Sequence, residues 1–168
     1  MINFKDLKTT QKEEVGESLV NKYLEAKGFI IYTPITNGSH AFDRLAIKDN
    51  KLLLIAEIKS KAKRLKYPDT GINIKHYNIY KDIQEKHNLN VFIFFVDEEM
   101  SKIYGGWLKD LEKEQEISHN GFNLKYPIKW NDIIYFPMKN TKTICDITKE
   151  DTDILKNFTA KNSKYIIT

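Results

Sequence analysis

Cysteine and long apolar runs are nearly absent from this sequence. Cys145 is the single cysteine, which excludes an intrachain disulfide and a cysteine-based zinc cluster. The longest purely apolar runs, residues 52–56 and 91–96, are far shorter than the ~20 residues that a membrane-spanning helix needs. The N-terminal stretch MINFKDLKTT lacks the charged-then-apolar layout of a signal peptide. We therefore expect a cytoplasmic protein, in a reducing setting and without a membrane partner.

A strong net charge is missing as well, because 27 basic residues face 23 acidic ones and leave +4. The positive excess is local: residues 59–66, KSKAKRLK, contain five Lys or Arg and no acid. Outside this segment the two signs almost balance. A basic patch of this kind suits a polyanion such as nucleic acid, although a solvated loop explains a run of lysines equally well.

The apolar periodicity predicts a series of helices and strands. Thr10 and Glu13 form a capping-box pattern ahead of an apolar helical stripe, and Gly28 stands where a helix commonly ends, so we expect a helix over 10–27. Further along the chain, the pattern predicts strands over 29–33, 42–48 and 52–59, a loop over 60–71, a helix over 72–87 and a buried strand over 91–96.

The C-terminal part is less regular. We expect a strand at 102–104, a short helix over 107–115, an irregular stretch over 118–138 with one strand at 133–136, and a final helix over 148–158. Together these elements predict an α/β sandwich with one mixed central β-sheet flanked by helices. The composition does not shift sharply along the chain, so we expect a single domain over residues 1–168.

The clearest chemical signal lies at the end of the predicted strand LLLIAEIKSK. Its first half is apolar on both faces, which takes it into the interior. Glu57 and Lys59 are two residues apart and therefore share one face of the strand. Burying either charge is costly unless it is paired or binds a metal. An ordinary surface Glu-Lys pair is the common alternative, and the apolar strand before the pair and the basic run after it argue against that alternative.

The preceding strand adds Asp43 if the hairpin has the right register. With a three-residue loop of Asp49, Asn50 and Lys51, Asp43 lies opposite Glu57. A two-residue turn would send the two carboxylates to opposite faces. Asp-Asn lacks the glycine of the best two-residue turns, so we expect the longer loop.

Two neighbouring carboxylates repel each other, and a hard divalent cation relieves the repulsion. We therefore expect Asp43 and Glu57 to bind Mg²⁺, with Mn²⁺ as a substitute, because Mg²⁺ prefers one or two carboxylates together with water and phosphate oxygens. Such an ion would activate water and stabilise charge on a phosphate. Lys59 would hold or deprotonate the water, or offset charge on the phosphate; the sequence leaves these roles open.

The first predicted helix offers a further acid. A helical projection places Glu17 at the border of the apolar face and Glu14 toward solvent. Glu13 falls inside the apolar arc and has a competing role in the capping box. On the helix pattern alone, a capping or solvated role explains Glu13 or Glu17 at least as well as a role in the site does.

These residues resemble the PD-(D/E)xK nuclease superfamily, which includes restriction enzymes and archaeal Holliday-junction resolvases. Residues 16–29, GESLVNKYLEAKGF, look like the first helix of small resolvase-like members, and Asp43 followed by Glu57-Ile58-Lys59 looks like the D…ExK core. The resemblance covers roughly residues 10–100, and residues 101–168 would be an elaboration of the same domain. Phe42 stands in the place of the namesake proline.

The resemblance implies a restriction endonuclease-like fold with Asp43, Glu57, Lys59 and Glu17 in the catalytic site. The helix after the core often contributes another polar residue, for which Lys75, His76 and Tyr80 qualify. His76 lies on the apolar stripe, which favours a core histidine. The expected function is Mg²⁺-dependent hydrolysis of DNA. We expect the nucleic acid to bind at Lys61, Lys63, Arg64, Lys66, Lys75 and Tyr80.

Two other functions stay open. A catalytically silent nucleic-acid-binding module would keep the same fold, and an RNA-directed nuclease would keep the same site. A binding module has no need for the trio of Asp43, Glu57 and Lys59, which favours the enzyme. A homodimer would suit duplex cleavage, although the sequence shows no interface.

Overall fold

The computed structural model describes residues 7–35, 41–50 and 52–158. A six-stranded sheet forms its centre, in the order β1-β2-β3-β5-β6-β11. Strands β3 and β5 run parallel, and every other neighbouring pair in this sheet is antiparallel, so the sheet is mixed. The strands are β1 Ile30–Tyr32, β2 Arg44–Lys48, β3 Leu52–Ser60, β5 Asn90–Asp97, β6 Lys102–Trp107 and β11 Lys142–Asp146.

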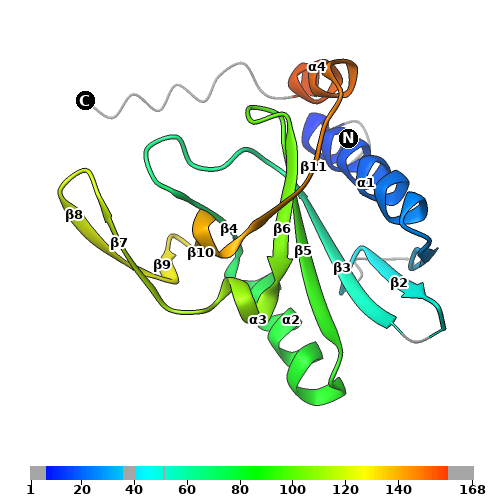
Figure 1. Ribbon diagram of the computed structural model, residues 1–168, viewed down its shortest axis with the longest axis horizontal. Helices are drawn as coiled ribbons and strands as arrows, with labels where there is room; N and C mark the ends of the chain where they lie inside the picture. Colours follow the sequence, from blue (N-terminus) through cyan, green and yellow to red (C-terminus); the bar gives the residue numbers. More distant parts are fainter. Residues whose placement is uncertain (1–6, 36–40, 51, 159–168) are drawn as a thin grey trace.

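Helices cover both faces of this sheet. Helices α1 (Lys8–Ala26) and α4 (Lys149–Phe158) pack against each other on one side, as Figure 1 shows, and α2 (Ile74–His87) and the short α3 (Leu108–Leu111) lie on the other. The alternation of β3 explains both layers: Leu54, Ala56 and Ile58 join the core under α1, whereas Ile55 joins the core under α2. None of the helices in the described ranges is long and apolar enough to cross a membrane.

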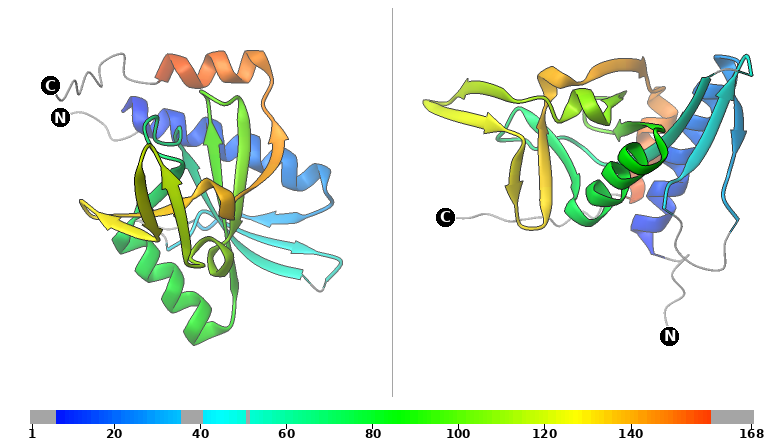
Figure 2. Two further views of the ribbon diagram at one scale, coloured as in Figure 1. Left: turned by 60° about the vertical axis from the view of Figure 1, so that its left-hand side comes forward. Right: turned by 90° about the horizontal axis from the view of Figure 1, so that it is seen from below.

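A second, smaller layer extends from this body. A three-stranded sheet has the order β4-β10-β9, and β7 and β8 form a separate hairpin that projects from one side (Figure 2). The bounds are β4 Asp69–Asn73, β7 Gln115–His119, β8 Phe122–Tyr126, β9 Ile128–Trp130 and β10 Ile133–Pro137, followed by a 3₁₀ turn at Met138–Asn140.

The predicted α/β sandwich with a mixed sheet and flanking helices is confirmed, and the helices and strands of residues 8–107 lie within a few residues of their predicted bounds. The exception is β4, which falls in the predicted loop because its polar sequence DTGIN becomes a strand only by pairing with β10. The prediction of an irregular stretch after residue 118 was also wrong. Asn120 and Gly121 have φ of 50° and 80° and form the tight turn between β7 and β8, a dipeptide that is itself a strong hairpin signal.

Candidate active site

The β2–β3 hairpin has the register that the site needs. Lys48 pairs with Leu52, Leu45 with Ile55, and Arg44 with Ala56, as the three-residue loop predicts. Asp49 and Asn50 adopt positive φ of 54° and 53° in the loop; Lys51 lies outside the described residues. One step further along the same register, Asp43 reaches β3: its Oδ2 accepts a hydrogen bond of 2.7 Å from the backbone N–H of Ile58.

Glu57 and Lys59 project from β3 toward α2. The Glu57 carboxylate is buried, and its Oε1 lies 2.6 Å from the Lys59 ammonium. Together with Asp43 they line a hollow of about 280 Å³, closed on the far side by Ile79 and Tyr80 of α2. The three predicted residues therefore meet in one concave site at the end of a buried strand.

Burial dominates the electrostatics of this site. It raises the pKa of Glu57 to about 7, with the negative charge of Asp43 adding to the effect and the Lys59 ammonium opposing it. Burial alone would lower the pKa of Lys59, but the carboxylates of Glu57 and Asp43 outweigh it and raise that pKa above its ordinary value. Lys59 therefore stays cationic at neutral pH, and Glu57 is balanced between its neutral and ionised forms.

Helix α2 contributes two further side chains. Tyr80 is buried and hydrogen-bonds Glu57, and the Glu57 charge together with burial raises the pKa of the phenol, so Tyr80 stays a hydrogen-bond donor. His76 Nδ1 lies 4.0 Å from Glu57 Oε1, and its side chain is half exposed. The expectation of a core histidine was wrong, because α2 turns this part of its stripe to the mouth of the site. Partial burial, reinforced by Lys59, lowers the pKa of His76.

The two helix acids occupy different places. Glu13 reaches the end of β3, where its Oε2 accepts a hydrogen bond of 3.0 Å from the backbone N–H of Ser60, close enough to Lys59 for their charges to interact. Burial raises its pKa. The capping box does not form, because α1 begins at Lys8 rather than after Thr10.

Glu17 instead forms an ion pair of 2.7 Å with Arg44, a residue that the sequence analysis overlooked. Arg44 is buried on the α1 side of β2 and also donates to Asn21 Oδ1 and to the backbone carbonyl of Asp43. A charged residue at a core-facing strand position needs a partner, and that was the available signal. Glu17 thus acts on the backbone beside Asp43, whereas Glu13 faces the site.

Asp43 and Glu57 are the candidate ligands for a divalent cation. No group of three or more His, Cys, Asp or Glu side chains converges as a metal cage within the described ranges. A pair of carboxylates that leaves room for water and phosphate is nevertheless the typical protein contribution to Mg²⁺ binding. Here Asp43 raises the pKa of the buried Glu57, and Lys59 supplies the positive charge that lies beside Glu57. Asp43 and Glu57 therefore have the chemistry of a divalent-cation site.

No family model and no curated protein matches the sequence. Among solved structures, the chain is similar to Hjc, a Holliday junction resolvase of the archaeal hyperthermophile Archaeoglobus fulgidus. The TM-score is 0.51 at 9% sequence identity, and the match covers 77% of this chain and 86% of Hjc. The chain has a resolvase-like fold. At this identity the similarity concerns the fold alone, and the site residues rest on their own geometry.

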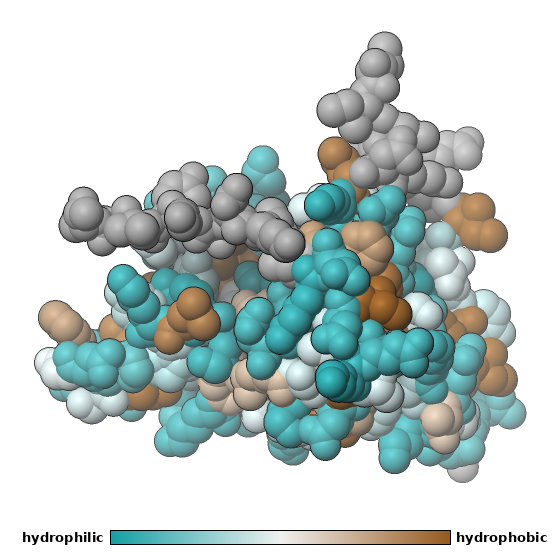
Figure 3. Space-filling view, turned by 90° about the horizontal axis from the view of Figure 1, so that it is seen from above, coloured by the Kyte–Doolittle hydropathy of each residue, from teal (hydrophilic) through white to brown (hydrophobic). Residues whose placement is uncertain are grey.

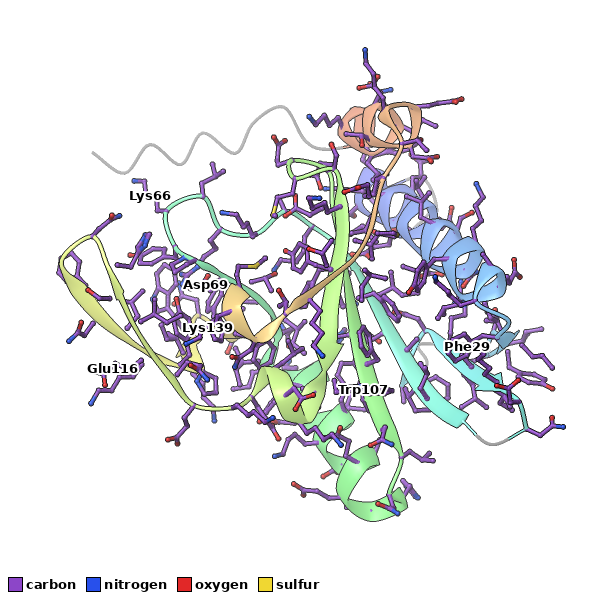
Figure 4. All side chains as sticks on the ribbon, in the orientation of Figure 1. Phe29, Lys66, Asp69, Trp107, Glu116 and Lys139 are labelled. Atoms are coloured by element: carbon purple, nitrogen blue, oxygen red, sulfur yellow. The ribbon has the colours of Figure 1, made fainter. Side chains whose placement is uncertain are left out.

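The basic segment that follows the active-site strand of this resolvase-like fold is only partly free to bind a ligand. Lys61 donates to the carbonyl of Gly71 at 2.9 Å, and burial lowers its pKa. Arg64 pairs with the buried Asp69. Lys66 and, on α2, Lys75 are exposed, and Figure 4 shows Lys66 extending away from the loop. The backbone N–H of Lys63 donates to Asp97.

Proposed function

We propose that this protein is a divalent-metal-dependent nuclease that hydrolyses phosphodiester bonds of DNA. The observation that carries the proposal is the convergence of Asp43, Glu57 and Lys59 in one hollow, with an almost completely buried carboxylate whose pKa is about 7. A surface ion pair would not shift a carboxyl in this way, and strongly perturbed groups in a concave site are typical of catalytic residues. The resolvase-like fold supports the same class of function.

Asp43 and Glu57 would hold the divalent cation. When bound, the ion supplies positive charge at the phosphate and increases the acidity of water. The Asp43 carboxylate is already oriented, because the N–H of Ile58 fixes its Oδ2. Tyr80 fixes Glu57 from the other side through its hydroxyl hydrogen bond. This pair of hydrogen bonds sets the carboxylates before a ligand arrives.

Lys59 has two roles that its geometry supports. In the free protein its ammonium neutralises Glu57 across 2.6 Å. Because Lys59 lines the hollow, the same ammonium would offset the negative charge that develops on a phosphodiester bound there. The charge of Glu13 adds a smaller contribution than Glu57 and Asp43 to the raised pKa of Lys59. Glu17 supports the site indirectly through Arg44.

DNA is the proposed substrate because the basic loop directly continues the active-site strand. Lys61, Lys63 and Lys66 lie along the segment after Lys59 and give it a positive charge that attracts phosphates. Lys75 adds a further exposed cation at the start of α2. RNA carries the same phosphates, so the choice between DNA and RNA is part of the test, as is a homodimer acting on both strands of a duplex.

The proposal is tested by incubating the protein with linear duplex, single-stranded and branched DNA, and with RNA, in Mg²⁺, Mn²⁺ or EDTA. We expect cutting in either metal and none in EDTA. Lys59→Ala should slow cutting at least ~100-fold, the scale for removing a charge-stabilising or acid–base group. Lys86→Ala is the matched control, because Lys86 is an exposed lysine at the far end of α2.

Each contrary result has a definite meaning. Cutting that persists undiminished in Lys59→Ala would remove Lys59 from the site. Metal-independent cutting would exclude the carboxylate pair as an ion site. Salt-sensitive DNA binding without cutting of any substrate would favour the silent binding module, and preference for RNA would redefine the substrate.

A further inference from the structure

The loop after the active-site strand and the β7–β8 hairpin enclose two adjoining hollows. One has a volume of about 460 Å³ and the other about 220 Å³. Both are lined by Tyr67 of the loop and Leu124 of β8, so they form a continuous surface. We call the side chains Leu65, Tyr67, Phe122, Leu124 and Trp130 of this surface the aromatic platform.

The aromatic platform exposes far more apolar area than single surface residues do. Phe122 is 71% exposed, Trp130 55% and Tyr67 41%, and Leu65 is more exposed still. Apolar side chains interrupt an otherwise hydrophilic surface on the hairpin side of Figure 3. A cluster of this size with large aromatic residues commonly marks a binding surface.

The platform is held rigid from below by an ion pair. The Arg64 guanidinium stacks 4.2 Å from the Tyr67 ring and 3.8 Å from the Tyr135 ring, and its Nε donates to Asp69 Oδ1 at 2.6 Å. Asp69 is fully buried and also accepts a hydrogen bond of 2.7 Å from the Tyr126 hydroxyl. Because these contacts fix Tyr67 in place, little side-chain conformational entropy is lost when a ligand stacks on its ring.

The exposed cation at the platform is Lys66. None of the described residues that line the two hollows is acidic, and the charge of Arg64, which also lines them, is balanced by the buried Asp69. The nearest acid of the hairpin, Glu116, pairs with Lys125 on the opposite face of β7 and β8, and Figure 4 shows it on the outer side of the hairpin. The surface therefore combines aromatic rings with the exposed Lys66 ammonium, and no carboxylate of the described residues lines the two hollows.

We propose that the aromatic platform binds the unpaired bases of a nucleic-acid strand, with the phosphates held by Lys66 and neighbouring cations. Exposed rings stack on bases of any sequence, and a cationic margin follows the backbone, which is the usual chemistry of single-strand binding. The loop that carries Leu65 and Tyr67 follows Lys59 directly in the sequence, so the platform and the active-site strand belong to one continuous segment of the chain. The proposal rests on the proposed function in taking nucleic acid as the ligand, and it defines the substrate as DNA with an unpaired segment.

Charge also argues against a second copy of the chain as the occupant. A twofold contact through the platform would bring the Lys66 ammonium groups of both protomers into one interface. Like charges held face to face oppose such an interface, whereas they favour a polyanion. Self-association is nevertheless one of the outcomes that the experiment distinguishes.

The experiment measures binding in EDTA, so that it does not depend on cleavage. The probes are a fluorescein-labelled oligothymidylate of ~20 nucleotides, longer than most single-strand sites, and a duplex of equal length. Phe122→Ala and Trp130→Ala should each weaken binding of the single strand ~5- to 150-fold and change duplex binding little. Lys66→Ser should reduce the salt dependence of single-strand binding by a slope of about 0.7. Tyr32→Ala, which removes an aromatic side chain of similar exposure (54%) from β1, should change neither.

Contrary results separate this proposal from the nuclease. Unchanged single-strand binding in Phe122→Ala and Trp130→Ala, with thermal melting showing intact folds, would overturn the platform while leaving the active site standing. Equal losses for single strand and duplex would also overturn it, as would dimer dissociation in Phe122→Ala without loss of binding. Binding that depends on Trp130, in a protein that cuts nothing, would instead refute the nuclease and keep the platform.

Discussion

Replacing Glu57 by glutamine should stabilise the metal-free protein while removing its activity. The pKa of Glu57 is raised from 4.5 to about 7, so the native chain keeps the proton in a pH range where the unfolded chain releases it. This contribution to stability is fully present below pH 4.5 and is lost as the pH rises through 7. Since a tenfold difference in proton affinity is worth ~1.4 kcal/mol, ionising Glu57 costs the fold about 3 kcal/mol at pH 8.

Glutamine resembles the neutral carboxyl group and does not ionise, so the variant lacks the free-energy cost of a buried negative charge. In EDTA, urea unfolding should therefore show Glu57→Gln more stable than the wild type by about 3 kcal/mol at pH 8 and nearly equal to it at pH 4.5. Magnesium should nearly cancel this difference at ~100 times its Kd and reverse the order at ~1,000 times its Kd, because the ion stabilises the wild type by ~2.7 and ~4.1 kcal/mol and has no complete site in the variant.

The matched control is Glu85→Gln, an exposed acid of α2. Its stability difference from the wild type should stay within ~0.5 kcal/mol at both pH values, as is usual for surface substitutions. The reasoning is refuted if Glu57→Gln is the less stable protein at pH 8, or if its difference from the wild type does not change with pH. Stabilisation of the variant by Mg²⁺ equal to that of the wild type would remove Glu57 from the ion site.

Other substitutions separate the supporting residues. Glu13→Gln should slow cleavage without loss of stability at pH 8, because burial disfavours the charge of Glu13. Glu17→Gln should lower the free energy of unfolding by ~1–3 kcal/mol, because the buried Arg44 would lose the charge of its ion-pair partner. Steady-state rates and urea unfolding of both variants check this, and the opposite pattern would exchange the two roles. Asp43→Asn should keep the hydrogen bond from Ile58 and the fold but weaken Mn²⁺ binding at least ~10-fold, measured by calorimetry; unchanged affinity would exclude Asp43 as a ligand.

The convergence of Asp43, Glu57 and Lys59 was predictable because its signals are local. The alternation of β3 alone places Glu57 and Lys59 together, and one loop length adds Asp43. The position of the helix acid was harder to predict from local sequence patterns. The choice between Glu13 and Glu17 depends on how far α1 reaches past the end of β3 and on Arg44, which are tertiary facts.

The second layer was hidden for the same reason. The residues of β4 have weak strand propensity and become a strand because β10, about sixty residues later, supplies its hydrogen-bond partner. The sequence correctly indicated the positive charge of the basic run, but it could not show that Arg64 forms an ion pair with Asp69. Only Asn120-Gly121 offered a local signal, and it marks the hairpin that carries much of the aromatic platform.

The packing of α4 against α1 has a consequence for the order in which the protein is made. Ile147 and Leu155 complete the apolar core beneath α1, on the reverse side of the strand that carries Glu57. Asp43, Glu57 and Lys59 leave the ribosome long before these two residues do. We therefore expect the core beneath α1 to be completed only after α4 has emerged, and the proposed nuclease activity to be absent from a nascent chain that still lacks α4.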